Sequence, residues 1–253
     1  MRRLLPAAVA ALVLLVVALA NVDLLSGRST PSFRDLATTQ RPARALASSL
    51  GTSALNPSAS FGQPFHGNPN LVLAYPFPAA PRWLGVQLLL HALLGGLGFL
   101  VFLSLLGRSG DAALAGALAF SFSGYALSCT AFLNATTTLA WIPWLLAAVA
   151  VARREGGPAF RLGFLGVAAS SLLLAHGGEP ALGLLGILLA FAFALSGFRG
   201  ERLRPLGALA GGGLVAALAS APYLLEVLRA TEACSRRLRG FSWGELAAIG
   251  FHP

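Results

Sequence analysis

The chain has 253 residues, of which 56% are hydrophobic and only 11% are charged, and its mean hydropathy is +0.74. Charged residues make up about a quarter of an ordinary soluble domain, so this composition excludes that class and indicates a polytopic membrane protein. The formal net charge of +9 rests on arginine alone, since the chain has no lysine. The arginines are scattered between apolar runs rather than gathered into a stripe, which argues against a nucleic-acid partner.

Several apolar stretches are long enough to cross the bilayer, which takes about 20 residues in a helix. They are apolar on all sides, as is typical of helices embedded in lipid. In chain order they are residues 4–22, 83–106, 111–130, 134–152, 160–176, 180–198 and 205–228. The sequence therefore predicts an all-α polytopic membrane protein with about seven transmembrane helices. Two groups of glycines predict close contacts between helix backbones: Gly95, Gly96 and Gly98, and Gly211, Gly212 and Gly213.

The first stretch, within residues 1–23, has two interpretations. Met1-Arg2-Arg3 followed by an apolar run and by Ala18-Leu19-Ala20 is also the pattern of a cleavable signal peptide. We favour a retained first transmembrane helix, because the apolar run is long and apolar residues recur at Leu24-Leu25.

The distribution of arginine predicts which helix ends face the cytoplasm. With the amino terminus inside, the inner side holds Arg2, Arg3, Arg108, Arg153, Arg154, Arg161, Arg199, Arg202 and Arg204, whereas the short loops near 131–133 and 177–179 hold none. Arginine-rich short loops stay in the cytoplasm, and long loops cross largely regardless of charge. We expect a multi-pass protein of the bacterial inner (cytoplasmic) membrane with a cytoplasmic amino terminus. A six-helix bundle over 83–228 then lies between an extracytoplasmic loop at 24–82 and an extracytoplasmic tail at 229–253.

The loop at 24–82 divides into two parts. Residues 35–50 favour an amphipathic helix that is interrupted near Pro42 and ends near Gly51. Residues 56–81 are rich in proline, which prevents a continuous helix, and in Gly-Asn turns. Aromatic side chains among these turns fit an interfacial belt or the re-entrant floor of a binding cavity, and the two interpretations are compatible.

Few acidic residues are present, so each can be judged. Asp35, beside Arg34 in the outer loop, is a candidate general base or metal ligand; its alternative is a helix N-cap or a solvated charge. Asp111 opens the third stretch and is interpreted as a helix N-cap. Asn134-Ala135-Thr136 matches a glycosylation sequon, but its loop is too short and too close to the membrane. No metal cluster, nucleotide-binding motif or hydrolase motif occurs, so the cofactor stays open and a divalent metal is not indicated.

Four further ionisable side chains are candidates for binding. His176 and Glu179 flank a Gly-Gly turn, where they would bind a substrate, metal or proton jointly, or cap two helix ends. Glu226 lies in the outer third of the last stretch, where an ionisable residue suggests function; pairing with Arg229 is the alternative. His91, in the second stretch, is expected to be a buried hydrogen-bonding histidine, with a binding role as the alternative.

Short motifs in a fixed order carry a resemblance over nearly the whole chain. They are Arg34-Asp35-Leu36, Phe61-Gly62-Gln63-Pro64 with Asn68-Pro69-Asn70, Tyr75-Pro76, His91 with Gly95-Gly96-Leu97-Gly98, Phe122-Ser123-Gly124-Tyr125, Trp141-Ile142-Pro143, His176-Gly177-Gly178-Glu179-Pro180, and Pro222 with Glu226 and Ser235-Arg236. In this order the chain resembles the amino-terminal third of the YfhO-like bacterial membrane proteins, which are grouped with the GT-C glycosyltransferases. It departs from them at Glu179, where the family usually has a polar amide.

The resemblance implies a GT-C-like fold and an enzyme that transfers a sugar from a polyprenyl-phosphate donor to an acceptor outside the cytoplasm. Asp35 corresponds to the catalytic base of that superfamily. The resemblance implies substrate-binding roles for Arg34, His91, His176, Glu179 and Glu226, and Arg34 would neutralise the donor phosphate.

Two other hypotheses remain at this stage. A transporter or lipid-glycan flippase would have paired charges deep in the spans and an internal repeat, and neither is clear in the sequence. A structural membrane subunit is the second. The chain stops at Pro253, where a family member would continue with another outer segment, so we expect a truncated gene product, a split gene or a pseudogene fragment. In a split gene, a second chain would supply the carboxyl-terminal part.

Overall fold

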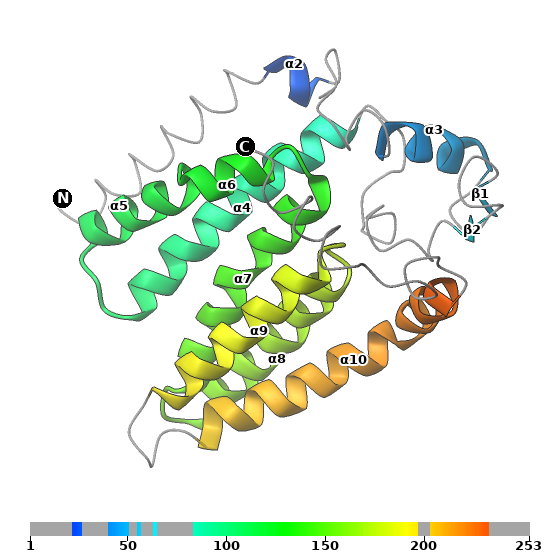
Figure 1. Cartoon of the computed structure of the whole chain (residues 1–253). Coiled ribbons are helices and arrows are strands. Elements are labelled where there is room, and N and C mark those ends of the chain that lie inside the picture. Colours follow the sequence, from blue (N-terminus) through cyan, green and yellow to red (C-terminus); the bar gives the residue numbers. More distant parts are fainter. Residues whose placement is uncertain are drawn as a thin grey trace, which may run out of the picture.

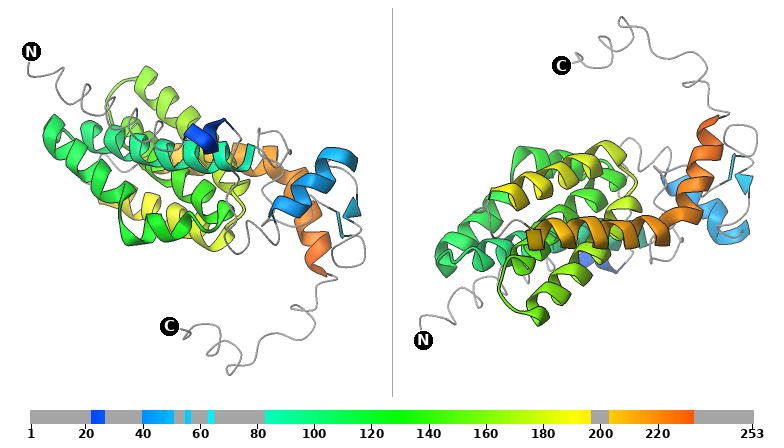
Figure 2. Two further views of the ribbon diagram at one scale, coloured as in Figure 1. Left: turned by 90° about the horizontal axis from the view of Figure 1, so that it is seen from above. Right: turned by 90° about the horizontal axis from the view of Figure 1, so that it is seen from below.

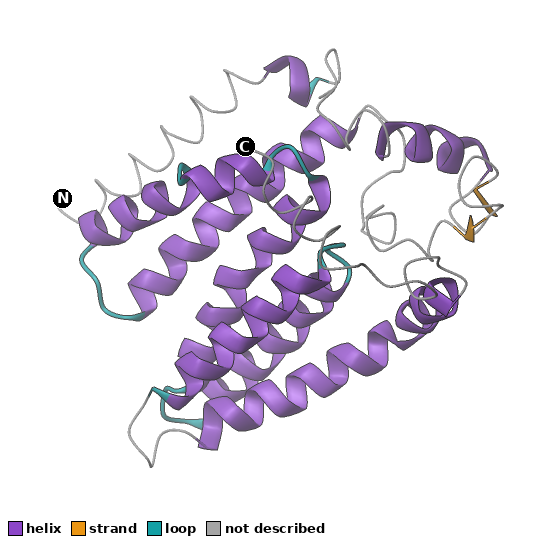
Figure 3. Cartoon of the chain, in the orientation of Figure 1, coloured by secondary structure: helices purple, strands orange, loops and turns teal. Residues whose placement is uncertain are grey.

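The computed structural model describes residues 22–26, 40–50, 55–56, 63–64, 83–196 and 203–232. These residues form helices, apart from one antiparallel pair of two-residue strands (Figure 3). The helices are α2 (Val22–Leu25), α3 (Arg41–Leu50), α4 (Trp83–Leu105), α5 (Gly110–Ser121), α6 (Gly124–Cys129), α7 (Leu133–Ala152), α8 (Gly157–Ala175), α9 (Pro180–Leu195) and α10 (Leu203–Glu232). In the strand pair, Leu55 of β1 (Leu55–Asn56) lies opposite Pro64 of β2 (Gln63–Pro64).

Three sequence predictions concern residues outside the described ranges. Nearly all of the first predicted helix, the site residues Arg34 and Asp35, and the tail beyond residue 232 lie outside the described residues.

Four helices of the described ranges are long and apolar enough to cross a membrane: Trp83–Leu105, Leu133–Ala152, Gly157–Ala175 and Leu203–Arg229. They match the predicted stretches that begin at 83, 134, 160 and 205 and confirm the prediction of a largely helical protein with several helices long and apolar enough to cross a membrane; the count of seven spans stays a prediction. The helix α9 is apolar but shorter, with 16 residues. Its exposed leucine and phenylalanine side chains suit a lipid-facing position.

The predicted span over 111–130 is not one helix, which corrects that prediction. The helix α5 ends at Ser121, and α6 begins at Gly124 with Ser123 as its N-cap. Ser123 has extended backbone angles, and its hydroxyl accepts a hydrogen bond from the Ala126 N–H at 3.2 Å. A serine cap of this kind satisfies a backbone donor that a continuous helix would satisfy itself. The N-cap of α5 is Ser109, so the N-cap predicted at Asp111 is also wrong; Asp111 lies in the first turn.

The helix α7 is the centre of the bundle. It packs against α4 on one side and against α8 and α9 on the other, while α10 packs mainly on α8 (Figure 1). In the most apolar 18-residue stretch of α7, 67% of the residues are buried inside the protein. The same fraction is 22% in each of the other three candidate spans. The largest core cluster contains Leu145, Val149 and Ala152 of α7, together with Val167 of α8 and Ala190 of α9.

Glycine allows the backbones of these helices to approach closely, as the sequence predicts. A Cβ atom on Gly95 of α4 would lie 3.3 Å from the Cα atom of Ala140 in α7. A Cβ atom on Gly212 of α10 would lie 2.9 Å from the carbonyl oxygen of Phe164 in α8. Contacts this short between backbones are available only where one partner has no side chain.

From α4 to α10 the chain runs back and forth, with α6 continuing roughly the direction of α5, so the connecting turns gather at two ends of the bundle (Figure 1). The turns at 106–109 and 153–156 and the first turn of α10 lie at one end. The turns at 130–132 and 176–179, the helix α3 and the last part of α10 lie at the other. Figure 2 shows the last part of α10 bending away from its first part, and Pro222 inside this helix accounts for a kink. The grouping agrees with the predicted topology, while the assignment of either end to the cytoplasm stays a prediction.

Candidate functional site

Polar side chains at the start of α7 hold the turn between α8 and α9 through hydrogen bonds. The hydroxyl of Thr137 donates a hydrogen bond to the Gly177 carbonyl at 2.5 Å, and the Asn134 amide donates to the Gly178 carbonyl at 3.3 Å. The backbone N–H of Glu179 donates to the hydroxyl of Thr138 at 3.2 Å. Three consecutive backbone groups of the turn are thereby fixed to one helix.

The local sequence explains why the chain turns here. His176 is the C-cap of α8, and Pro180 occupies the first position of α9, where its missing N–H is not needed. Gly178 has a φ of +89°, a left-handed conformation that favours glycine. A Cβ atom on Gly177 would lie 2.9 Å from the Cα atom of Thr138, so the turn sits directly on α7.

Glu179 presents a half-buried carboxylate at this turn. Its Oε2 atom accepts a hydrogen bond from the Asn134 Nδ2 atom at 2.9 Å. Burial raises the pKa of Glu179 above that of an ordinary glutamate. Within the described ranges the ion pair that forms is Glu226 with Arg229, so no described cation neutralises Glu179. An oriented carboxylate without a cation can accept hydrogen bonds from hydroxyl groups or take up a proton.

The Glu179 side chain borders a cavity of about 510 Å³, which we call the Glu179 cavity. The facing wall comes from α6 and the residues after it, with Tyr125, Cys129 and Phe132. The Tyr125 and Cys129 side chains are hydrogen-bonded to each other. Volumes of this order are typical of sites for small molecules, which are about 300–1,000 Å³.

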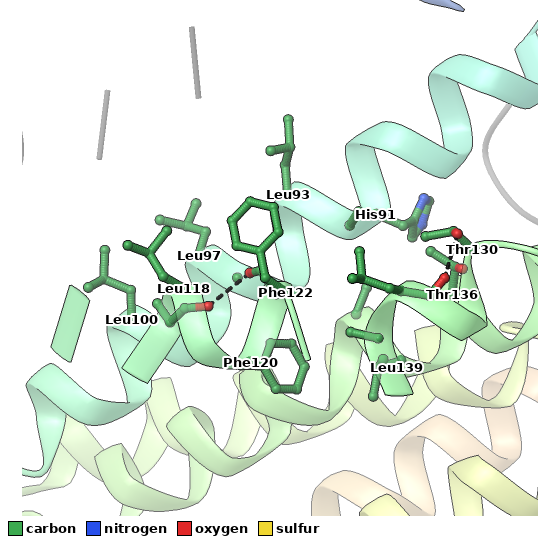
Figure 4. Close-up of a pocket in the computed structure, with 18 of the residues that line it drawn as sticks. His91, Leu93, Leu97, Leu100, Leu118, Phe120, Phe122, Thr130, Thr136 and Leu139 are labelled. Carbon is green, nitrogen blue, oxygen red and sulfur yellow. Dashed lines mark hydrogen bonds between the residues drawn. The ribbon is translucent and has the colours of Figure 1, made fainter. Parts of the chain in front are cut away.

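A second cavity, of about 190 Å³, lies on the other side of α6 between α4, α5 and α7 (Figure 4), and we call it the apolar groove. Its hydroxyl groups are turned to backbone carbonyls: Ser121 donates to Ala117, Thr130 to Leu127 and Thr136 to Cys129. The remaining surface is leucine, alanine, glycine and phenylalanine, except for His91 at the end near Thr130 and Thr136 (Figure 4). The groove therefore suits a hydrocarbon chain.

The short helix α6 separates the two cavities. Ala126 and Leu127 face the apolar groove, whereas Tyr125, Ser128 and Cys129 face the Glu179 cavity. The same short helix thus contributes apolar side chains to one cavity and three polar side chains to the other.

His91 lies in the contact between α4 and α7 and is 1% exposed. Its Nδ1 atom is hydrogen-bonded to the Gln87 carbonyl at 2.7 Å, and its ring meets Trp141 edge-on at 6.2 Å. This confirms the expected buried, hydrogen-bonding histidine. Arg44 of α3, also buried, donates to the Gln87 side chain and joins α3 to α4. Burial lowers the pKa of Arg44 to about 10.

The structure does not direct His176 and Glu179 to a common point, although they share a turn. The ring of His176 packs on Tyr223 of α10, with 4.5 Å between ring centroids. Glu226 forms a salt bridge with Arg229 at 3.1 Å, which confirms the alternative considered for it. Of the predicted site residues that are described, Glu179 is the one that faces a sizeable cavity with an oriented carboxylate.

Sequence reasoning missed the residues that hold Glu179. Asn134 donates hydrogen bonds to the turn and to the carboxylate, and Thr137 and Thr138 form further hydrogen bonds to the turn. The available signal is a polar run, Asn134 to Thr138, at the start of an otherwise apolar stretch. Such polar groups in a membrane helix usually bond to a neighbouring helix.

Within the described part of the chain, no group of three or more His, Cys, Asp or Glu residues is placed to hold a metal ion. No protein-family model, curated protein or solved structure matches the chain.

Proposed function

We propose that the chain is the membrane-embedded part of a glycosyltransferase, which takes a sugar from a polyprenyl-phosphate donor and transfers it to an acceptor at the end of the bundle that carries α3. The observation that supports this proposal is the pair of cavities on the two faces of α6. A lipid-linked sugar has an apolar chain joined to a polar head. The apolar groove suits the chain, and the Glu179 cavity, whose lining is otherwise largely apolar, presents Glu179, Tyr125 and Ser128 to the head.

The roles of the residues follow from the chemistry of the donor. The acceptor hydroxyl oxygen attacks the anomeric carbon, the bond to the donor phosphate breaks, and the phosphate leaves with the bonding electrons. The acceptor proton passes to a carboxylate base, for which the resemblance to the YfhO-like family suggests Asp35. Glu179, oriented by Asn134, accepts hydrogen bonds from sugar hydroxyls.

Sugar transfer in membranes tests this function, with any partner chain co-expressed and a radiolabelled polyprenyl-phosphate sugar as donor. We expect Asp35→Asn to abolish transfer, because the base is lost. Glu179→Gln should lower kcat/KM by about 10- to 150-fold, because a hydrogen bond to a charged group contributes about 1.5–3 kcal/mol. Glu226→Gln is the matched control and should retain activity, since Glu226 is bound to Arg229 on the surface. Full transfer by Asp35→Asn contradicts the assignment.

A further inference from the structure

The end of the bundle opposite the Glu179 cavity carries a cluster of arginines on three helix ends. Arg154 follows α7, Arg161 lies in the second turn of α8, and Arg204 is the second residue of α10. All three are exposed, and we call them the arginine patch.

Two contacts place these three residues at the same end of the bundle. The Nη1 atom of Arg204 donates to the Arg154 carbonyl at 3.3 Å, which brings α10 against the end of α7. A Cβ atom on Gly163 would lie 2.6 Å from the backbone nitrogen of Ala152, so these residues are level in the antiparallel helices α7 and α8. Arg154 and Arg161 each lie two residues nearer the same end of their helices, so they are at a similar height along the bundle.

The patch is not neutralised by a described carboxylate. Glu155, its nearest acidic neighbour in the sequence, forms no ion pair within the described ranges, where the salt bridge present is Glu226–Arg229 at the other end. Arg153 is distinct from the patch, because its guanidinium donates to the Phe193 carbonyl and stacks on the Phe193 ring, 4.0 Å from the centroid. Three cations at one end of the bundle, with no counter-ion among the described residues, attract an external anion.

Exposed apolar side chains beside the arginine patch indicate which class of anion binds there. Leu162 and Leu165 on α8 are 64% and 63% exposed, and Leu203, next to Arg204, is 77% exposed. A cation bordered by outward-facing leucines matches a phospholipid, whose phosphate and acyl chains are adjacent. It does not match a free phosphate or a nucleotide, which would leave the leucines in water.

We propose that the arginine patch binds the headgroup phosphate of an anionic phospholipid, whose acyl chains lie along Leu162 and Leu165 of α8. The lipid neutralises the mutual repulsion of the three guanidinium groups and links the ends of α7, α8 and α10. This site lies at the opposite end of the bundle from the Glu179 cavity and does not depend on sugar transfer.

Native mass spectrometry of the full chain in a non-ionic detergent tests the proposal. The purified protein is titrated with phosphatidylglycerol, with phosphatidylcholine and with inorganic phosphate. Each arginine near an anionic surface contributes about 1 kcal/mol, or about fivefold in affinity. We therefore expect phosphatidylglycerol to bind at least roughly tenfold more tightly than phosphatidylcholine. Arg154→Gln/Arg161→Gln/Arg204→Gln should abolish the preference, whereas the control Arg41→Gln/Arg229→Gln, at the other end, should preserve it.

Equal binding of the two lipids by the unaltered chain would overturn the proposal, as would a preference that survives the triple glutamine variant. Displacement of phosphatidylglycerol by millimolar inorganic phosphate would also overturn it, in favour of a site for a free anion. If the glutamine variant does not fold, Arg154→Lys/Arg161→Lys/Arg204→Lys keeps the charge and should retain the preference; its loss there would contradict a headgroup site based on charge.

Discussion

Asn134 connects two features that are far apart in the sequence, the start of α7 and the turn at Glu179. Its amide donates both to the Gly178 carbonyl and to the Glu179 carboxylate, 45 residues away. The side chain is buried, so no water replaces these bonds if the amide is removed. Asn134 therefore fixes the turn and the carboxylate together, beside the bonds that Thr137 and Thr138 make to the turn.

Asn134→Leu should lower the free energy of unfolding by about 1–3 kcal/mol, because it leaves a buried carbonyl and a half-buried carboxylate without their donor. Thermal unfolding in detergent measures the loss. Ser128→Ala is the control: the Ser128 hydroxyl bonds only within α6, to the Gly124 carbonyl, and is exposed. An Asn134→Leu protein as stable as the unaltered chain would show that the turn is held without these bonds.

The raised pKa of Glu179 makes the stability of the protein depend on pH. In the unfolded chain the carboxyl returns to a pKa of about 4.3. The native state then binds more protons between that pH and the raised value, so the free energy of unfolding falls as the pH rises through this window. Glu179→Gln should remove this part of the fall, which thermal unfolding between about pH 4 and pH 8 would detect. A Glu179→Gln profile identical to that of the unaltered chain would contradict the raised pKa.

At the scale of helices, hydropathy located the spans but not the break in the third one. The stretch 111–130 is apolar throughout, and nothing in its composition distinguishes one helix from two. The break depends on Ser123 leaving the helical conformation to cap α6, a local choice between two hydrogen-bonding arrangements of similar energy. The prediction of Asp111 as the N-cap fails because serine caps as well as aspartate, and Ser109 takes that position.

Two adjacent glycines of α10 give a matched test of helix contact. In Gly212→Ala the new Cβ atom would lie 2.9 Å from the Phe164 carbonyl and 3.0 Å from the Ala168 nitrogen, both backbone atoms of α8. Crowding of this kind costs about 1–3 kcal/mol. In Gly213→Ala the Cβ atom meets nothing within 4 Å, and helix propensity should add up to about 1 kcal/mol. Opposite shifts in the unfolding temperature are expected, and equal shifts would contradict the packing of α10 on α8.

Across the whole molecule, the arrangement of turns at two ends predicts a labelling pattern. In a chain with Cys129→Ala and Cys234→Ala, a cysteine in place of Ser109 or Glu155 should react in the same compartment. One in place of Ser49 on α3 should react in the other, because these positions lie at opposite ends of the bundle. A membrane-impermeant maleimide applied to intact and to lysed spheroplasts distinguishes the two. Labelling of Ser49→Cys together with Glu155→Cys in intact cells would contradict the topology.

Much of the helical bundle could be predicted from the sequence, because the length and hydropathy of each apolar segment locate its helix. The candidate site was reached in part: the Gly-Gly turn and its Glu179 stand out in the sequence, but their partners on α7 do not. The bonds from Asn134, Thr137 and Thr138 join segments about 40 residues apart. They form only once α7 and α8 have packed in register, and periodicity within one segment carries no information on register between two.

The apolar groove has its rim along the sides of the helices, where Leu97, Phe122 and Leu127 are exposed, rather than at either end of the bundle. A ligand that enters here arrives by lateral diffusion in the plane of the bilayer and never crosses bulk water. Its occupancy is set by a mole fraction among lipids, not by a molar concentration. Diluting the ligand with inert lipid should empty the groove, whereas diluting the vesicles with buffer should leave it filled.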